Sequence, residues 1–198
     1  AALPRGLVAK AEPIRRMAAP QEPRYLTEEM DVTQGKLAVG YRCTSKDYPA
    51  MVLANLIFGG TSNSKLFLNV REKLSLCYYA SSSYARSKNI LTVSSGVETG
   101  SRDRALEEID RQLKAVQTGD WEDWEQEGAL QAIRSSLLSL SDSQGALENF
   151  YLGQIASGVH ETPEELAAEL ERVTKERIVA AARTVHLDTV YFLGGRDA

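Results

Sequence analysis

The distribution of apolar and polar residues along the chain first becomes regular in residues 36–42. Every second residue there is apolar or aromatic, which is typical of a β-strand with one buried face. Residues 48–58 are apolar nearly all round, as in a helix that is buried on more than one side. Asp47 stands at the N-cap position, and a proline occupies the first turn behind it. This stretch predicts a strand followed by a deeply packed helix.

A second group of elements is predicted in residues 61–97. A helix is expected within residues 61–74, because apolar residues recur there at helical spacing. The chain then becomes extended over residues 76–81 and again over residues 90–97, and the polar residues between suit a hairpin loop. The apolar stripe of the predicted helix consists of Leu66, Phe67, Val70 and Leu74.

Helical patterns dominate the rest of the chain. An amphipathic helix begins near Ser101 and ends at Gly119, and a long helix runs from Trp121 towards Leu140. Another helix reaches Ser157, two short helices follow, and an extended run closes the pattern at residues 190–193. The helix that reaches Ser157 is expected to turn four residues inward: Leu147, Phe150, Tyr151 and Ile155.

The order of these elements indicates the fold class. Helices are bunched between strands instead of alternating with them, which argues against a doubly wound parallel sheet. Three of the predicted strands alternate between apolar and polar residues, as expected of an antiparallel sheet with one covered face. We therefore expect an α+β fold, a two-layer sandwich in which a mainly antiparallel sheet packs against several helices.

Residues 1–30 differ from the rest and are interpreted as an extended, proline-rich linker or arm. Four of the six prolines lie there, and proline disfavours regular elements. Residues 31–198 are expected to form a single α+β domain. Because the chain begins at Ala1 without Met, we interpret it as a fragment of a longer protein.

Composition narrows the function without naming it. The net charge of −4 and the lack of a basic stripe argue against nucleic-acid binding. No apolar run is long enough for a membrane span, and no signal peptide is visible. Cys43 and Cys77 are too few for a disulfide framework, so reduced thiols in a cytoplasmic protein are expected.

Arg71 and Tyr78 are the candidate functional residues. They lie seven residues apart across the predicted helix-to-strand junction. A permanently charged guanidinium and a phenol held on a rigid scaffold suit the binding of a carbonyl or an oxyanion. From the residues alone a structural role stays open, in which the arginine pairs with a carboxylate and the tyrosine packs in the core with its hydroxyl satisfied.

Four segments carry a resemblance to a known family. They are QGKLAVGYR (34–42), DYPAMVLANLIFGG (47–60), SKLFLNVREKLSLCYYASSSY (64–84) and VTKERIVAAARTVHLDTVYFLGG (173–195). Together they resemble the second, zinc-free half of the pitrilysin/insulinase-type zinc peptidases, the inverzincins, which include the mitochondrial processing peptidases. The amino-acid sequence of the third segment is most similar to that of bacterial members.

The resemblance implies a division of labour between two homologous halves that face each other across a closed chamber. The first half would carry H-x-x-E-H and a distant glutamate, which together hold zinc and activate water. The second half would supply an arginine and a tyrosine for the substrate and the oxyanion, and Arg71 and Tyr78 match those positions. The implied partners are a zinc-binding N-terminal half, on the same polypeptide or a partner subunit, and a peptide substrate.

No zinc motif is present in this chain. His160 and His186 are isolated, and neither has a second histidine one helical turn away. We therefore expect no metal or cofactor here, zinc in the partner half, and no hydrolysis by this chain alone. The alternative is a pseudo-peptidase that only binds peptides or stabilises an assembly. In isolation, a surface meant for the missing half could also drive homodimer formation.

Overall fold

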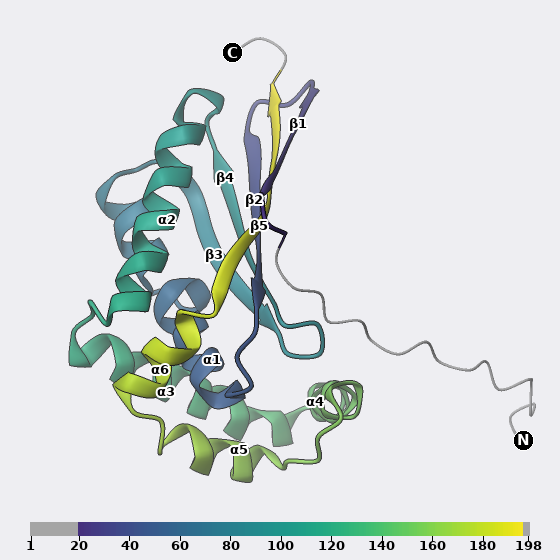
Figure 1. The fold of residues 1–198 in the computed structure, drawn as a ribbon. Helices are drawn as coiled ribbons and strands as arrows, with labels where there is room; N and C mark the ends of the chain where they lie inside the picture. The colour runs from purple at the N-terminus through teal and green to yellow at the C-terminus, as the bar shows by residue number, and fades with distance from the viewer. Residues whose placement is uncertain (1–19, 196–198) are drawn as a thin grey trace, which may run out of the picture.

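The computed structural model describes residues 20–195, which form a five-stranded sheet with helices packed mainly on one of its faces (Figure 1). The strand order is β1-β5-β2-β4-β3. The α+β fold expected from the sequence is confirmed. The strands are β1 (Arg24–Met30), β2 (Gly35–Cys43), β3 (Cys77–Ala85), β4 (Ile90–Val97) and β5 (Val185–Gly195).

The helices include two short π-helical segments and two 3-10 turns. They are α1 (Tyr48–Asn55), η1 (Leu56–Gly60), η2 (Leu66–Lys73), η3 (Thr99–Ser101), α2 (Arg102–Thr118), α3 (Asp123–Leu138), η4 (Ser139–Asp142), α4 (Gln144–Ser157), α5 (Pro163–Leu170) and α6 (Lys175–Ala182).

Strand β2 is central and antiparallel to both of its neighbours, β4 and β5. Buried and more exposed residues alternate along β2 as predicted from the sequence. Leu37, Val39 and Tyr41 are buried on the helix side, and Lys36 is exposed on the other side. Helices of the described chain therefore cover one face, and the opposite face is left open (Figure 1).

Strand β1 corrects the expected linker. Residues Arg24–Met30 pair in parallel with β5, so the connector predicted for residues 1–30 does not extend through them. All seven residues of β1 are exposed, because no other described residues cover either face of this edge strand. Without a buried face it has no alternating pattern for the sequence to display. The rest of the predicted linker, residues 1–19, lies outside the described residues.

Helix α1 begins as predicted, where the Asp47 carboxylate accepts a hydrogen bond from the Ala50 backbone N–H. It widens into the π-helical η1, and η2 is also a π-helix, a form often found at functional sites. Gly59 lets η1 lie against β3, since a Cβ there would fall 2.9 Å from the Ser82 backbone nitrogen.

Helix α4 departs from expectation. Leu147 and Phe150 are half-buried as predicted, but Tyr151 and Ile155 are 41% and 64% exposed. The four residues have the i, i+3, i+4, i+8 spacing of one helix face, but the described chain covers only part of that face. Tertiary packing, not helical periodicity, decides which of them are covered.

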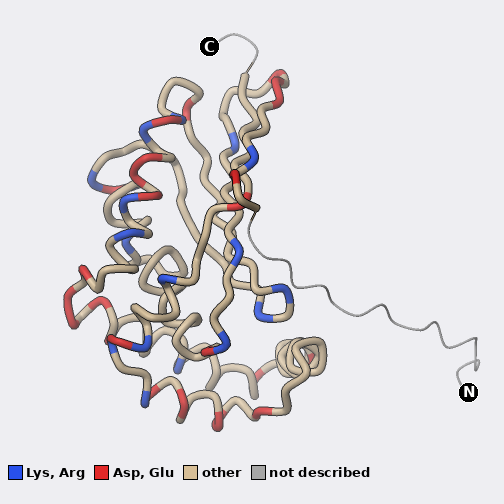
Figure 2. Tube along the Cα trace, in the orientation of Figure 1, with Lys and Arg blue, Asp and Glu red and all other residues tan. Residues whose placement is uncertain are grey.

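One hydrophobic core joins the sheet to the helices in the described residues. Acidic and basic residues are interspersed along most elements, without a large field of one sign (Figure 2). None of the described helices is both long and apolar enough to span a membrane.

Candidate functional site

Arg71 and Tyr78 line the same surface pocket, which has a volume of about 400 Å³. Arg71 comes from η2 and Tyr78 from the beginning of β3. The structure therefore brings together the two residues singled out from the sequence. The pocket is lined by Arg71, Glu72, Ser75, Leu76, Cys77, Tyr78 and Glu98.

A tight turn brings the two residues together. Ser75 has a φ of 48°, in the left-handed region that non-glycine residues rarely adopt. The turn is held by hydrogen bonds from the Ser75 N–H to the Arg71 carbonyl (3.1 Å) and from the Leu76 N–H to the Val70 carbonyl (3.0 Å). The chain thus passes from the end of η2 into β3 within a few residues.

A β-bulge at Tyr78 sets the direction of its side chain. Cys77 pairs with Val97 and Tyr79 pairs with Gly96, so Tyr78 is an extra residue in β3. In a regular strand Tyr78 and Tyr79 would point to opposite faces, yet they are 59% and 40% exposed. The bulge therefore keeps Tyr78 out of the core, against the structural role left open by the sequence.

Tyr79 lies across Gly96 of β4. A Cβ on Gly96 would fall 2.6 Å from Cε1 of the tyrosine ring, so only glycine leaves room for it. The Lys36 ammonium lies 5.4 Å from the centre of the same ring. These contacts hold Tyr79 away from the pocket that Tyr78 lines.

The pocket carries one cation and two carboxylates. The Arg71 Nε lies 3.6 Å from the Glu72 carboxylate, and the guanidinium lies 4.7 Å from the centre of the Phe67 ring. The Tyr78 hydroxyl donates a long hydrogen bond of 3.5 Å to Glu98. Both candidate groups are partly exposed and weakly held, so an incoming ligand can compete for them.

Cys77 is not an activated nucleophile. Burial raises the pKa of its thiol, and the Ser95 hydroxyl and the Arg71 charge only partly oppose that shift. Burial likewise raises the pKa of Cys43 to about 12. Both thiols are therefore protonated at neutral pH.

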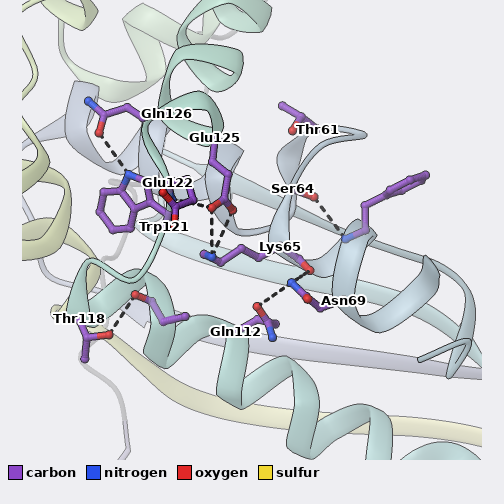
Figure 3. A network of polar contacts seen from close by, with 12 residues as sticks. Thr61, Ser64, Lys65, Asn69, Gln112, Thr118, Trp121, Glu122, Glu125 and Gln126 are labelled. Carbon is purple, nitrogen blue, oxygen red and sulfur yellow. Dashed lines mark hydrogen bonds and ion pairs between the residues drawn. The ribbon is translucent and has the colours of Figure 1, made fainter. Parts of the chain in front are cut away.

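A buried polar network connects η2 to α2 and α3 (Figure 3). The Lys65 Nζ lies 3.2 Å from the Glu125 carboxylate of α3, and both side chains are about nine-tenths buried. The Asn69 side-chain amide donates to the Lys65 carbonyl and to Gln112 of α2, each at 3.1 Å. The network ties the helix that carries Arg71 to two others.

The described residues do not fit a zinc ion. No group of three or more His, Cys, Asp or Glu side chains converges anywhere in residues 20–195. His160 and His186 are both exposed.

Glu98 is a pocket residue that the sequence reasoning missed. It follows the last residue of β4, opposite the beginning of β3, where the antiparallel hairpin sets it beside Tyr78. The hairpin predicted from residues 76–81 and 90–97 could have indicated this neighbour. The sequence does not show the β-bulge at Tyr78. Because a bulge shifts the strand register by one residue, a regular hairpin would not have placed Glu98 beside Tyr78.

Comparison with known proteins identifies the family. A model described as "Peptidase M16 inactive domain" matches residues 7–133, more than half of the chain. The chain belongs to the M16 peptidase inactive-domain family. The zinc-free half expected from the sequence is confirmed at this level.

Three similar proteins illustrate the relationship. The chain is 41% identical over 180 residues to "Probable inactive metalloprotease YmfF" of Bacillus subtilis, covering 89% of this chain and 42% of the relative. It is 26% identical over 164 residues to "Uncharacterized zinc protease YmxG" of the same organism, covering 80% of this chain and 40% of that protein. A conserved protein from Enterococcus faecalis superposes with a TM-score of 0.88 at 31% identity, over 96% of this chain and 46% of the other. The M16 inactive domain described here thus spans less than half the length of these relatives.

Proposed function

We propose that this M16 inactive domain is the non-catalytic half of a zinc metallopeptidase, which closes a peptide-binding chamber opposite a zinc-carrying half. The observation that carries the proposal is the single pocket lined by both Arg71 and Tyr78. Its support is the family membership together with relatives about twice as long as this chain. The companion half, on the same polypeptide or a partner chain, would supply the metal and the water.

In this proposal Arg71 and Tyr78 bind the reacting peptide. The guanidinium and the phenol each offer N–H or O–H donors to a carbonyl oxygen that becomes negative in the transition state. A preorganised donor of this kind contributes about 10²–10³-fold to kcat when it acts on the oxyanion. If the same groups hold the peptide backbone in the ground state instead, their loss raises KM at similar kcat.

Glu98 competes with the substrate for Tyr78. Its carboxylate accepts from the phenol in the chain described here, and a nearby negative charge disfavours an oxyanion. Substrate binding would therefore require the hydroxyl to leave Glu98 and turn to the peptide. The 3.5 Å length of that hydrogen bond makes this exchange inexpensive.

A second candidate function is favoured by a different observation. The YmfF relative is named a probable inactive metalloprotease, whereas YmxG is named a zinc protease. The chain could therefore serve as a pseudo-peptidase that binds peptides or stabilises an assembly without hydrolysis. Its free cysteines, Cys43 and Cys77, fit a cytoplasmic location in either case.

The deciding experiment assembles the chain with its companion half and measures peptide hydrolysis. Arg71→Ala and Tyr78→Phe are expected to lower kcat/KM by about 10²-fold or more each. Lys73→Ala and Tyr79→Phe are the matched controls, since each removes a similar group from a neighbouring position that does not line the pocket. They are expected to leave kcat/KM within about twofold of wild type.

The outcomes separate the two functions. Hydrolysis lost in the Arg71 and Tyr78 variants alone supports the proposed peptidase half. Hydrolysis by wild type that both variants retain removes the assigned roles. An assembly that binds peptide but never cleaves it favours the pseudo-peptidase.

A further inference from the structure

A pocket of about 260 Å³ lies between helix α4 and the loop of the β3–β4 hairpin. The hairpin contributes Arg86 to its wall, and the inner side of α4 contributes Phe150 and Gln154. A water molecule occupies about 30 Å³, and pockets for drug-sized ligands range from about 300 to 1,000 Å³. The pocket therefore has room for a small molecule. None of its described lining residues belongs to the pocket that Arg71 and Tyr78 line.

One face of α4 is turned toward this pocket. The lining residues of the helix are spaced i, i+1, i+4, i+5 and i+8, which is the spacing of a single helical face. Gly153 lies in the middle of that face, and a Cβ added to it would meet nothing within 4 Å. The lack of a side chain at Gly153 therefore leaves this part of the pocket open. The five lining residues are Asn149, Phe150, Gly153, Gln154 and Ser157.

Gln154 lies in the wall of the pocket with an unused hydrogen-bond acceptor. The residue is 6% exposed, and its Oε1 is one of two buried side-chain N or O atoms without a hydrogen-bond partner among the described residues. A buried acceptor without a donor destabilises the folded state, so native proteins keep few of them. The last torsion of a glutamine side chain is soft, so the amide can turn toward a molecule in the pocket. The unpartnered oxygen therefore indicates a ligand that offers an N–H donor.

Arg86 supplies the charge among the described lining residues, and it is held in place by its neighbours. Its Cζ lies 3.8 Å from the centre of the Tyr48 ring, and its Nη1 lies 2.9 Å from the Glu161 carboxylate. The hairpin turn is fixed as well, because the Asn89 N–H donates to the Arg86 carbonyl at 3.3 Å. A guanidinium has five N–H donors in a planar fork, so a second carboxylate can bind to Arg86 beside Glu161.

The charges around the pocket favour a ligand that carries both signs. Arg86 attracts a carboxylate, and Glu161 beside it attracts an ammonium group. Glu161 repels an anion that lacks a positive group, and Arg86 repels a cation that lacks a negative group. The rings of Tyr48 and Phe150 offer apolar contact to the rest of such a ligand. An amino acid combines a carboxylate, an ammonium group and a size that fits the pocket.

We propose that this pocket binds a free α-amino acid. The carboxylate of the amino acid accepts hydrogen bonds from the Arg86 guanidinium, and its ammonium group donates to Oε1 of Gln154. Its side chain lies against the Phe150 ring, so amino acids with apolar side chains bind most tightly. The inference is independent of the proposed peptidase function, because it uses no residue of the pocket lined by Arg71 and Tyr78.

Thermal unfolding of the full chain in the presence of each common amino acid measures binding. At about one hundred times the dissociation constant, an amino acid that binds should raise Tm by about 5–10 °C. Isothermal titration calorimetry then compares that amino acid with its N-acetyl derivative, which lacks the ammonium group, and with its amide, which lacks the carboxylate. The dissociation constant of each derivative should be higher by about tenfold or more.

Two variants place the binding in this pocket. Gly153→Leu fills the open space and should abolish binding without lowering Tm, because leucine favours a helix more than glycine does. Gln154→Met removes the unpartnered oxygen, so it should weaken binding by about tenfold or more and leave the Tm of the unliganded chain unchanged or higher. Gly128→Leu is the matched control. Gly128 lies on α3 away from the pocket and also has open space around it, so this variant should bind the amino acid as wild type does.

Each outcome supports or overturns the inference. Binding that is weakened or lost in Gly153→Leu and Gln154→Met and kept in Gly128→Leu supports it. The absence of a Tm shift and of a heat signal with every amino acid overturns it, as does binding that either pocket variant retains at wild-type strength. Equal affinity for the free amino acid and both derivatives also overturns it. The same holds for a crystal structure, grown with the amino acid, that shows only water beside Gln154.

Discussion

The ionisation of Asp188 is closely tied to the fold. It is the extra residue of β5 where the pairing with β2 shifts, and its buried carboxylate accepts from Arg42 and Arg24, each at 2.8 Å. Burial opposes ionisation, but the hydrogen bonds from Arg42, Thr189 and Arg24 outweigh it and hold the pKa of Asp188 well below its usual range. One carboxylate thereby links β1, β2 and β5.

The depressed pKa predicts the pH dependence of stability. The unfolded pKa is about 3.9, so the stabilisation by Asp188 is fully present above that pH and is lost as pH falls towards the folded pKa. Asp188→Asn should lower the free energy of unfolding at pH 7 by about 3 kcal/mol, because the Arg42 charge is left unpaired in a partly buried site. When the free energy of unfolding is measured by urea denaturation at pH 7 and pH 3, the difference between the two values should be smaller in Asp188→Asn than in wild type.

Arg24→Ala serves as the control for that comparison. The Arg24 side chain is 64% exposed, so its removal should lower the free energy of unfolding by less than about 1 kcal/mol. If the free energy of unfolding falls equally between pH 7 and pH 3 in wild type and in Asp188→Asn, Asp188 is not the source of the pH dependence.

For Arg71 and Tyr78, the local sequence predicts some features of the pocket and not others. Arg71 and Tyr78 could be chosen from their chemistry and spacing, because a helix-to-strand junction is visible in the pattern. That Tyr78 is exposed and faces Glu98 depends on the bulge opposite Gly96. A bulge depends on pairing with another strand, which no local pattern encodes.

At the scale of elements, η2 is positioned by its buried apolar side chains and by the Lys65–Glu125 pair at its beginning. Only Leu66 and Val70 of η2 are fully buried among its described residues. The Glu125 carboxylate also accepts from the Glu122 N–H at 2.9 Å, so one side chain caps α3 and holds η2 (Figure 3). A change at Lys65 should therefore reach Arg71 through the helix.

Lys65→Met is expected to lower the free energy of unfolding by about 3 kcal/mol, because it leaves the Glu125 carboxylate buried and unpaired. The double variant Lys65→Met/Glu125→Gln should lose less than the sum of the two single variants, since it removes both charges. Chemical denaturation of all four proteins measures this coupling. Strict additivity would mean that the pair does not hold η2.

The elements themselves were largely predictable from local patterns. The strand Ile90–Val97 and the helix up to Thr118 match the expected ranges. A capping box of Thr162 and Glu165 begins α5. The π-helical form of η1 and η2 was not predicted, because the apolar pattern of a short π-helix resembles that of an α-helix. Both segments contact β3 and α2.

At the scale of the whole molecule, the described chain is a folded body with an incomplete surface. Its core is continuous, but the open sheet face, the edge strand β1 and the side chains of Tyr151, Leu152 and Ile155 on α4 are not covered by other described residues. This combination is expected of one half of a larger assembly.

Metal removal tests this description. Because residues 20–195 contain no cluster of three metal-ligating side chains, EDTA should leave the Tm of the isolated chain unchanged within about 1 °C. Metal analysis after gel filtration in zinc-containing buffer should find far less than one zinc per chain. A stoichiometric zinc ion, or a Tm lowered by the chelator, would contradict the assignment of the metal to another half.

The sequence by itself determined the type and order of most elements, the family and the pair Arg71 and Tyr78. These follow from information carried within short segments: periodicity, capping residues and motif spacing. Tertiary structure alone decided the parallel pairing of β1 with β5, the bulge that exposes Tyr78 and the bare outer side of α4. Each of these depends on contacts between residues far apart in the chain, or on surfaces that this chain does not cover.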